Sequence, residues 1–173
     1  MAQKWNTQVV FPQDNYLIRC IKAEFGPSKS SGKPMITLGF EIVSPENINV
    51  AGSEYIVAGQ NVSPLYIVTK SIDADGNVDV SKSETIKKMV DDLCAKFKVA
   101  EITDPENPDV TVFVGKTVWA LLNGEKRERR KAPTSEQLAA GQKQGDVIKN
   151  PITGEPLVSY YPKIDQIFGV PNN

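Results

Sequence analysis

The residues best suited to bind a charged ligand are five basic side chains that closely follow a β-prone segment. That segment, residues 110–122, reads VTVFVGKTVWALL and carries Trp119. The basic side chains are Lys126, Arg127, Arg129, Arg130 and Lys131, and only Glu125 and Glu128 accompany them. Lysine and arginine neutralise phosphates, and aromatic rings stack on unpaired bases. The pattern favours single-stranded nucleic acid as the ligand.

Alternation along 110–122 predicts which of its side chains face a core. The aliphatic set would point inward: Val112, Val114, Val118, Ala120 and Leu122. Trp119 shares the opposite face with Phe113, Thr117, Leu121 and Asn123. An exposed indole is costly unless something stacks on it, so Trp119 is a candidate stacking residue. The alternative, that Trp119 packs under the helix or the basic segment, stays open. Lys116 interrupts the aliphatic set and is a further candidate contact.

Two adjacent tyrosines near the end of the chain divide between the faces of a strand. Tyr160 and Tyr161 must point to opposite sides. Val158 accompanies Tyr160, which favours the core, whereas Lys163 accompanies Tyr161. Tyr161 and Lys163 are therefore predicted to contact the ligand. Tyr55 and Tyr66, in other β-prone segments, are interpreted as structural.

A Ser/Gly-rich turn, PSKSSGKP at 27–34, adds Lys29 and Lys33. Two interpretations remain open for this turn, a solvated hairpin tip and a phosphate-contacting loop. The chain as a whole has 20 Lys+Arg against 21 Asp+Glu, so any basic surface must arise by sorting charges. Acidic residues collect in 73–79, 91–92 and 101–109. We therefore expect one positive and one negative face.

Several chemistries are excluded by composition. The chain has no histidine, which rules out a Ser-His-Asp triad and His-ligated metals. Cys20 and Cys94 are far apart in sequence and are predicted to be buried free thiols in a reducing compartment. Residues 73–84 resemble a calcium loop, but Val78 occupies the position that requires glycine, so a surface turn is expected. We predict no metal site and no cofactor.

The elements expected from the pattern are mostly strands. They lie at 15–25, 34–43, 54–62, 65–70, 110–122 and 157–161. Residues 110–122 are either one strand or two strands bent at Gly115. One long helix is predicted from the stripe Ile86, Met89, Val90, Leu93, Cys94 and Phe97, with Ser81 and Glu84 as a capping box. Residues 123–156, called the arm below, form a polar segment expected to be flexible, with a short helix at 135–140.

This order of elements predicts a single domain over residues 1–173. Five to six strands with one inserted helix and a long basic loop favour a mostly β, OB-fold-like barrel. An SH3-like barrel or a small α+β sandwich would give a similar order. No window approaches a membrane span and the N-terminus lacks a signal-peptide core, so we expect a soluble, intracellular protein.

Four segments give the chain a resemblance to a known family. They are NYLIRCIKAEF, SKSSGKPMITLGFEIV, GKTVWALL with its basic arm, and YYPKIDQIF. With them the chain resembles small phage-encoded single-stranded DNA-binding proteins with an OB-fold. The resemblance implies a non-enzymatic role in phage DNA replication, recombination or repair, in the cytoplasm of an infected bacterium. It places Lys29 and Lys33 on the first long hairpin, and Trp119 with 126–131 beside the DNA groove.

The resemblance also bears on partners. Many proteins of this class recruit replication or recombination partners through an acidic tail, whereas this chain ends GVPNN. Recruitment through such a tail is therefore not expected, and a homo-oligomer is left open. Two other functions remain: a protein-interaction or virion-assembly module on the same barrel, and a carboxylate-metal nuclease using Glu41 and Asp165.

Overall fold

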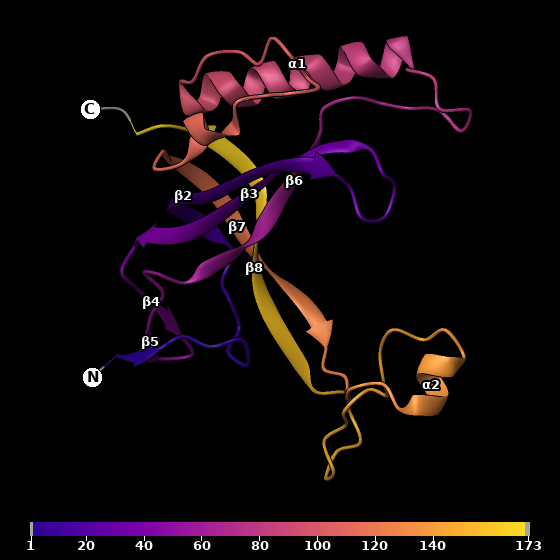
Figure 1. Cartoon of the computed structure of the whole chain (residues 1–173). Coiled ribbons are helices and arrows are strands. Elements are labelled where there is room, and N and C mark those ends of the chain that lie inside the picture. Colours follow the sequence, from indigo (N-terminus) through magenta and orange to yellow (C-terminus); the bar gives the residue numbers. More distant parts are fainter. Residues whose placement is uncertain (1, 172–173) are drawn as a thin grey trace.

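The computed structural model describes residues 2–171 and shows a mostly β chain with one long helix (Figure 1). Five strands form the main sheet in the order β6-β3-β2-β7-β8, and each neighbouring pair is antiparallel. Their bounds are Asp14–Pro27 for β2, Pro34–Ser44 for β3, Asn61–Val68 for β6, Thr117–Glu128 for β7 and Val158–Gly169 for β8. The predicted strands at 15–25 and 34–43 are confirmed.

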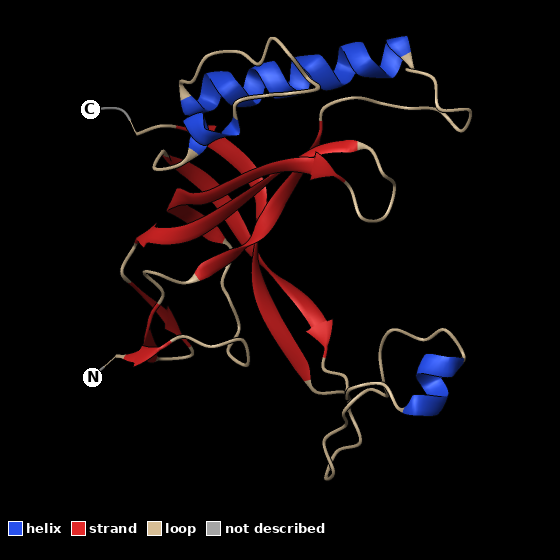
Figure 2. Cartoon of the chain, in the orientation of Figure 1, coloured by secondary structure: helices blue, strands red, loops and turns tan. Residues whose placement is uncertain are grey.

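A smaller sheet lies at the N-terminal side of the molecule (Figure 2). It has the order β1-β5-β4, with β1 at Gln3–Lys4, β4 at Asn47–Val50 and β5 at Ser53–Ile56. β1 runs parallel to β5, and Trp5 directly after it is buried with its ring edge-on to Phe11. Burial of this indole anchors the N-terminal segment to the core.

The core is built from the inward face of the main sheet. Alternate residues of three strands are fully buried: Tyr16, Ile18 and Cys20 of β2, Ile36, Leu38, Phe40 and Ile42 of β3, and Val118, Ala120 and Leu122 of β7. The period-2 pattern of these strands causes this arrangement, since successive side chains point to opposite faces. The predicted inward positions of Val118, Ala120 and Leu122 are confirmed. Cys20 and Cys94 are buried and free, as expected.

The helix α1, Val80–Phe97, packs across one end of the sheet through Val90, Cys94 and Phe97 (Figure 1). Phe97 contacts Phe40 and Phe113, at centroid distances of 6.1 and 5.3 Å. Asp79 caps the helix by accepting a hydrogen bond from the Lys82 N–H, so the predicted capping box at Ser81 and Glu84 is wrong. Met89 is also not a core residue, because its side chain is 65% exposed.

The predicted strand at 110–122 begins seven residues too early. Residues Val110–Phe113 form a 3-10 helix, η1, capped by the Asp109 carboxylate, and Gly115 has φ +86°. A strand does not accommodate either feature. The predicted faces of residues 113 and 114 are therefore wrong, because Phe113 is fully buried and Val114 is exposed. Val112 packs against the core, as predicted.

The predicted strand at 54–62 is divided between two strands, with residues 57–60 outside both. β5 ends at Ile56, and a turn with Gly59 at φ +83° leads into β6. Pro64, interpreted as a break, lies within β6. Proline is tolerated there because β6 is an outer strand of the sheet. The two outer strands, β6 and β8, approach each other and share a groove of about 440 Å³ with α1. Within residues 2–171, hydrogen-bonded ladders join β6 only to β3, and β8 only to β7.

The arm continues the β7–β8 hairpin away from the rest of the molecule (Figure 1). The β7–β8 ladder extends to Glu128, paired with Val158, so the first six arm residues are strand. The helix α2, Ser135–Ala139, has Thr134 as its cap and Gln137 completing a capping box. This confirms the predicted short helix. The predicted flexibility of the arm stays a prediction.

Candidate nucleic-acid interface

Basic side chains of the arm converge on one hollow of about 560 Å³, which we call the arm hollow. Its charged lining residues are Arg127, Arg129, Arg130, Lys131 and Lys143, together with Glu128. Tyr161 and Ser159 of β8 also line it. Four of the five predicted basic residues thus lie together with Tyr161, which was also predicted to contact the ligand. The arrangement offers positive charge and one aromatic ring in the same place.

Backbone hydrogen bonds fold the arm so that these side chains meet. The Arg129 N–H donates to the Leu157 carbonyl at 2.8 Å, and the Lys131 N–H donates to the Asp146 carbonyl at 2.9 Å. The Arg130 guanidinium donates to the Gly145 carbonyl at 3.2 Å. A side chain at Gly145 would lie 2.5 Å from the Lys131 carbonyl oxygen, so only glycine permits this close approach. The turn thereby brings Lys143 to the same hollow as residues 127–131.

Arg127, one of the lining residues of the arm hollow, is held by two neighbours. Its guanidinium carbon lies 4.8 Å from the centroid of the Tyr161 ring, and its Nη2 donates to Glu125 Oε2 at 2.8 Å. That hydrogen bond is the main cause that raises the pKa of Arg127, and the Glu125 charge and the phenols of Tyr161 and Tyr66 add to it. The same hydrogen bond lowers the pKa of Glu125. The ring is therefore partly covered by a cation that a phosphate could attract.

Tyr66 lines a second hollow and does not line the arm hollow. The second hollow, of about 720 Å³, is bounded by the turn 26–31, including Lys29, and by Phe25, Met35 and Tyr66. We call it the hairpin hollow. Tyr66 is 60% exposed, so its interpretation as a structural residue is wrong. Tyr55, in contrast, packs against the core as predicted.

Two predicted contacts lie far from the arm hollow. Trp119 is on the outward face of β7, 36% exposed and paired with Leu17 and Gly169, which confirms that it points away from the core. Eight residues of strand separate Trp119 from Arg127, a distance of about 26 Å. Lys116 is exposed just before β7. The structure therefore does not bring Trp119 and Lys116 together with the arm residues.

The other predicted contacts occupy intermediate positions. Lys126 is exposed on β7, paired with Tyr160, and does not line the arm hollow. Lys163 is exposed on β8 opposite Asn123, and its charge contributes to lowering the pKa of Glu125. Lys29 lines the hairpin hollow, whereas Lys33 is half-buried in the turn and does not. Their roles as contacts stay predictions.

Sequence reasoning missed Lys143 and Tyr66. Lys143 could not be placed, because only the fold of the arm brings it near residues 127–131. Tyr66 could have been found: Leu65 and Ile67 on either side pack against the core, and strict alternation then directs Tyr66 outward.

The carboxylates proposed for a nuclease lie on different strands. Glu41 of β3 accepts a hydrogen bond from the Arg19 guanidinium at 3.2 Å, and Asp165 is exposed on β8. Over residues 2–171, no group of three or more His, Cys, Asp or Glu side chains is arranged to hold a metal ion. The turn at 73–77 is a surface turn, as predicted, since Asp73 Oδ1 accepts from the N–H groups of Asp75 and Asn77.

No family model, no curated protein and no solved structure matches the chain. In the part of the chain that the structure describes, no helix combines the length and apolarity needed to cross a membrane.

Proposed function

We propose that this protein binds single-stranded DNA without sequence preference and is not an enzyme. The observation that carries the proposal is the arm hollow, in which five basic side chains and Tyr161 line one space. Basic side chains attract the phosphates of any sequence, and a stacked ring accepts any base, because every base has an aromatic face.

The order of the elements supports this proposal. Three antiparallel strands, a helix and then two further strands, in the order β6-β3-β2-β7-β8, correspond to the strand order of an OB-fold. We propose that β6 and β8 close this sheet into an OB-like barrel. In such barrels the second and third strands, with the loops of the first and last hairpins, bind oligonucleotides. Here those parts are β3, β6, the turn 27–34 and the arm.

The proposed path of the bound single-stranded DNA follows the two hollows. One basic residue, Lys29, lines the hairpin hollow, and five basic residues line the arm hollow. Tyr66 lines the hairpin hollow, and its phenol contributes to raising the pKa of Arg127, which lines the arm hollow. The proposed path takes the DNA strand over Tyr66 from one hollow to the other. On this path Tyr66 and Tyr161 offer the stacking faces, and Trp119 is not part of it.

The biological setting rests on the resemblance of the sequence. A protein of this kind would coat single strands during phage DNA replication, recombination or repair in an infected bacterial cell. Replication or recombination proteins would be its partners.

Fluorescence anisotropy of a labelled oligonucleotide tests the proposal. We expect binding of a single strand, much weaker binding of the same sequence as a duplex, and an affinity that falls steeply with salt. Intrinsic tryptophan fluorescence is a poor reporter, because Trp5 is buried and Trp119 is distant from the arm hollow.

A charge-matched pair of variants locates the site. One variant replaces Arg129, Lys131 and Lys143 with alanine, and its control replaces the exposed Lys22, Lys82 and Lys88. The first should flatten the salt slope by about 2, since each phosphate contact on a single strand contributes roughly 0.7. Equal slopes for both variants, or equal affinity for duplex, would contradict the proposal and favour a protein-interaction module.

A further inference from the structure

The far end of the arm carries the most exposed large apolar side chain of residues 2–171. Ile152 is 92% exposed, whereas the next value is 69%, at Val80. Ile152 lies in the turn of a short hairpin, residues 148–157, which we call the tip hairpin, and it does not pack against the core. Single exposed apolar residues are common on protein surfaces. The meaning of this one depends on how firmly its turn is built and on what lies beside it.

Hydrogen bonds fix the turn that presents Ile152. The Asn150 side-chain oxygen accepts from the N–H groups of Ile152 and Thr153, at 2.8 and 3.3 Å. The Asn150 carbonyl accepts from the Gly154 N–H at 2.9 Å, and the Asn150 N–H donates to the Glu155 carbonyl at 2.8 Å. Gly154 has φ +73°, which glycine adopts without strain. The turn is thus preformed, so little entropy is lost when its end meets a ligand.

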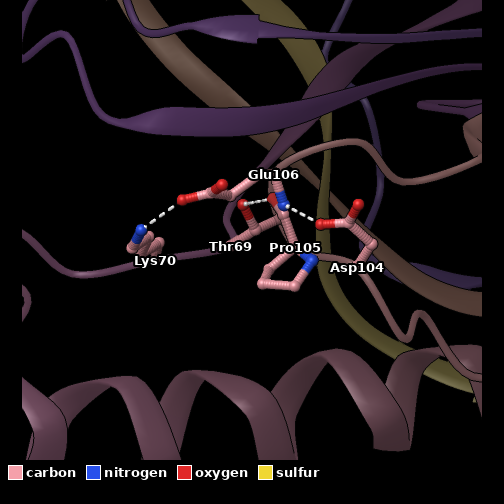
Figure 3. A network of polar contacts seen from close by, with 5 residues as sticks. All are labelled: Thr69, Lys70, Asp104, Pro105 and Glu106. Atoms are coloured by element: carbon pink, nitrogen blue, oxygen red, sulfur yellow. Dashed lines mark hydrogen bonds and ion pairs between the residues drawn. The ribbon is translucent and has the colours of Figure 1, made fainter.

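The tip hairpin is held away from the rest of the chain, unlike a loop at the opposite end of the molecule. That loop is tied to the segment that leaves β6 (Figure 3). There the Thr69 hydroxyl donates to the Pro105 carbonyl at 3.1 Å, and Lys70 Nζ donates to Glu106 Oε1 at 2.6 Å. Among residues 2–171, the hydrogen bonds of 150–155 join only members of the tip hairpin. Ile152 is therefore open to a ligand.

The tip hairpin begins at one wall of the arm hollow. The Arg129 N–H donates to the Leu157 carbonyl, and the Arg129 carbonyl accepts from the Ile148 N–H, both at 2.8 Å. Arg129 and Ile148 both line the arm hollow. Ile152 follows Ile148 by four residues, so the two lie at most about 14 Å apart, a reach of about four stacked base pairs at roughly 3.4 Å each. Nucleotides next to a DNA strand in the arm hollow are thus within reach of Ile152.

The turn and the arm hollow differ in chemistry. Residues 150–154 carry no charge, and Pro151 and Ile152 present apolar surface, whereas five basic residues line the hollow against Glu128. A single strand offers phosphates and unpaired bases, but the end of a duplex also offers the flat, uncharged face of a base pair. Some DNA-binding proteins insert isoleucine or proline between stacked bases. A junction between a single strand and a duplex presents phosphates and a base-pair face side by side.

We propose that the tip hairpin recognises the junction between a single strand and a duplex. This inference rests on the proposed binding of single strands by the arm hollow. The single strand lies in the arm hollow, and Ile152, next to Pro151, packs on the exposed face of the last base pair. Burial of the isoleucine side chain favours this complex over the complex with a single strand alone. The protein therefore binds at the edge of a single-stranded gap more tightly than within it.

Fluorescence anisotropy of the full chain tests the proposal with four labelled probes. They are a single strand, the same strand as a 3′ or a 5′ overhang on a duplex, and a blunt duplex. At least one overhang probe should bind about tenfold more tightly than the single strand, because only there is Ile152 buried. The blunt duplex should bind weakly, because it offers no single strand to the arm hollow.

The outcomes separate this inference from the proposed function. If the single strand binds and neither overhang probe binds more tightly, the junction inference fails and the proposed function stands. If neither the single strand nor an overhang probe binds, both fail.

Ile152→Ser and Leu138→Ser form a matched pair of variants. Both side chains are exposed apolar members of the arm, and Leu138 lies on α2, outside the tip hairpin. Ile152→Ser should remove the preference for the overhang probe, whereas Leu138→Ser should keep it. Thermal unfolding of each variant confirms the fold. A preference that survives Ile152→Ser overturns the proposal, since the added phosphates of the duplex would then account for it.

Methyl resonances measure the contact directly. The ring currents of stacked bases shift a methyl group that lies above a base-pair face upfield. The Ile152 methyl signals should therefore move upfield with the overhang probe and stay nearly unchanged with the single strand. The Leu138 methyl signals serve as the control and should not move. Ile152 signals that stay in place, or that move equally with both probes, overturn the proposal.

Discussion

Arg127 and Tyr161 show how one residue pair can serve both charge and stacking. The guanidinium covers one face of the ring, so on that face a base must stack on the guanidinium plane or displace it from the ring. Either event keeps a flat cation and an aromatic ring next to the phosphates. The Glu125 carboxylate also binds the Arg127 guanidinium, and this contact limits the motion of the Arg127 side chain before a ligand binds. In the ion pair of Arg127 and Glu125, a phosphate can therefore take the place of the Glu125 carboxylate.

Replacing Tyr161 with alanine should weaken binding of a short single strand by about 1–3 kcal/mol, because a base loses one stacking face. Replacing Trp119 with alanine should leave this affinity unchanged, because Trp119 lies about 26 Å away along β7. Anisotropy with a short oligonucleotide measures both. The unfolding midpoints serve as controls, since a collapsed midpoint would assign the ring to the core. Loss of binding in the Trp119 variant alone would place the DNA strand near Trp119 and not in the arm hollow.

Tyr16 predicts a loss of stability at alkaline pH. Burial, and to a lesser degree the Asp14 charge, raises the pKa of Tyr16 to about 12, and its hydroxyl donates to the Pro12 carbonyl at 3.0 Å. An unfolded tyrosine ionises at about pH 10. The folded state binds the proton more tightly, so this contribution is present below pH 10 and is lost as the pH rises toward 12.

Denaturant unfolding at several pH values checks this effect. Tyr16→Phe, which cannot ionise, should show a shallower fall in the free energy of unfolding between about pH 10 and 12 than the unmodified chain. The difference between the two curves isolates Tyr16 from the other tyrosines and lysines. Parallel curves would refute the assignment.

At the scale of elements, the sequence predicted strands where alternation was strict and failed where local caps prevailed. β3 could be predicted because Ile36, Leu38, Phe40 and Ile42 all lie on its buried face. Residues 110–116 have strand-forming side chains, but the Asp109 cap and the positive φ at Gly115 impose a 3-10 turn. Propensity describes single residues, whereas a cap and a turn act on a whole segment.

The arm illustrates the same limit for the candidate site. Its polar, Gly- and Pro-containing composition predicted a loop, and the basic residues within it were found correctly as a group. The extension of the β7–β8 ladder to Glu128 depends on pairing with Val158, thirty residues away in sequence. Long-range pairing of this kind leaves little trace in one strand alone. The sequence therefore predicted most of the basic residues of the arm hollow, but it did not predict that they line one hollow.

Removal of most of the arm should leave the fold intact. We propose replacing residues 130–156 with Asn-Gly, which favours the tight turn of a two-residue hairpin. These residues have few buried side chains, so the unfolding midpoint should change by only a few degrees. Binding of single strands should fall by at least tenfold, because most of the arm hollow is lost. A variant that unfolds would show that the arm is part of the core.

Charge is sorted over the whole molecule even though its sum is near zero. Segment 69–109, which includes α1, holds ten acidic and six basic residues. α1 and the arm lie at opposite ends of the molecule (Figure 1). The acidic residues of segment 69–109 therefore do little to neutralise the basic residues of the arm, since charges farther apart than about 8 Å are screened at physiological salt. The arm can remain locally positive in a chain of net charge −1. The sequence revealed the sorted segments, but their separation is a property of the fold.

The two exposed or half-exposed tyrosines of the proposed path imply that base faces, and not only phosphates, determine affinity. An abasic strand keeps every phosphate and removes every stacking face. If Tyr66 and Tyr161 each stack on one base, an abasic strand should bind at least about 30-fold more weakly than a normal strand of equal length, since two stacks contribute roughly 2 kcal/mol or more. Its salt slope should stay the same, because the phosphate contacts are unchanged. The Tyr66→Ala, Tyr161→Ala double variant should bind both strands with nearly equal affinity. If the double variant still bound the normal DNA strand about 30-fold more tightly than the abasic one, the bases would stack on other rings. Trp119 would then be the next residue to replace.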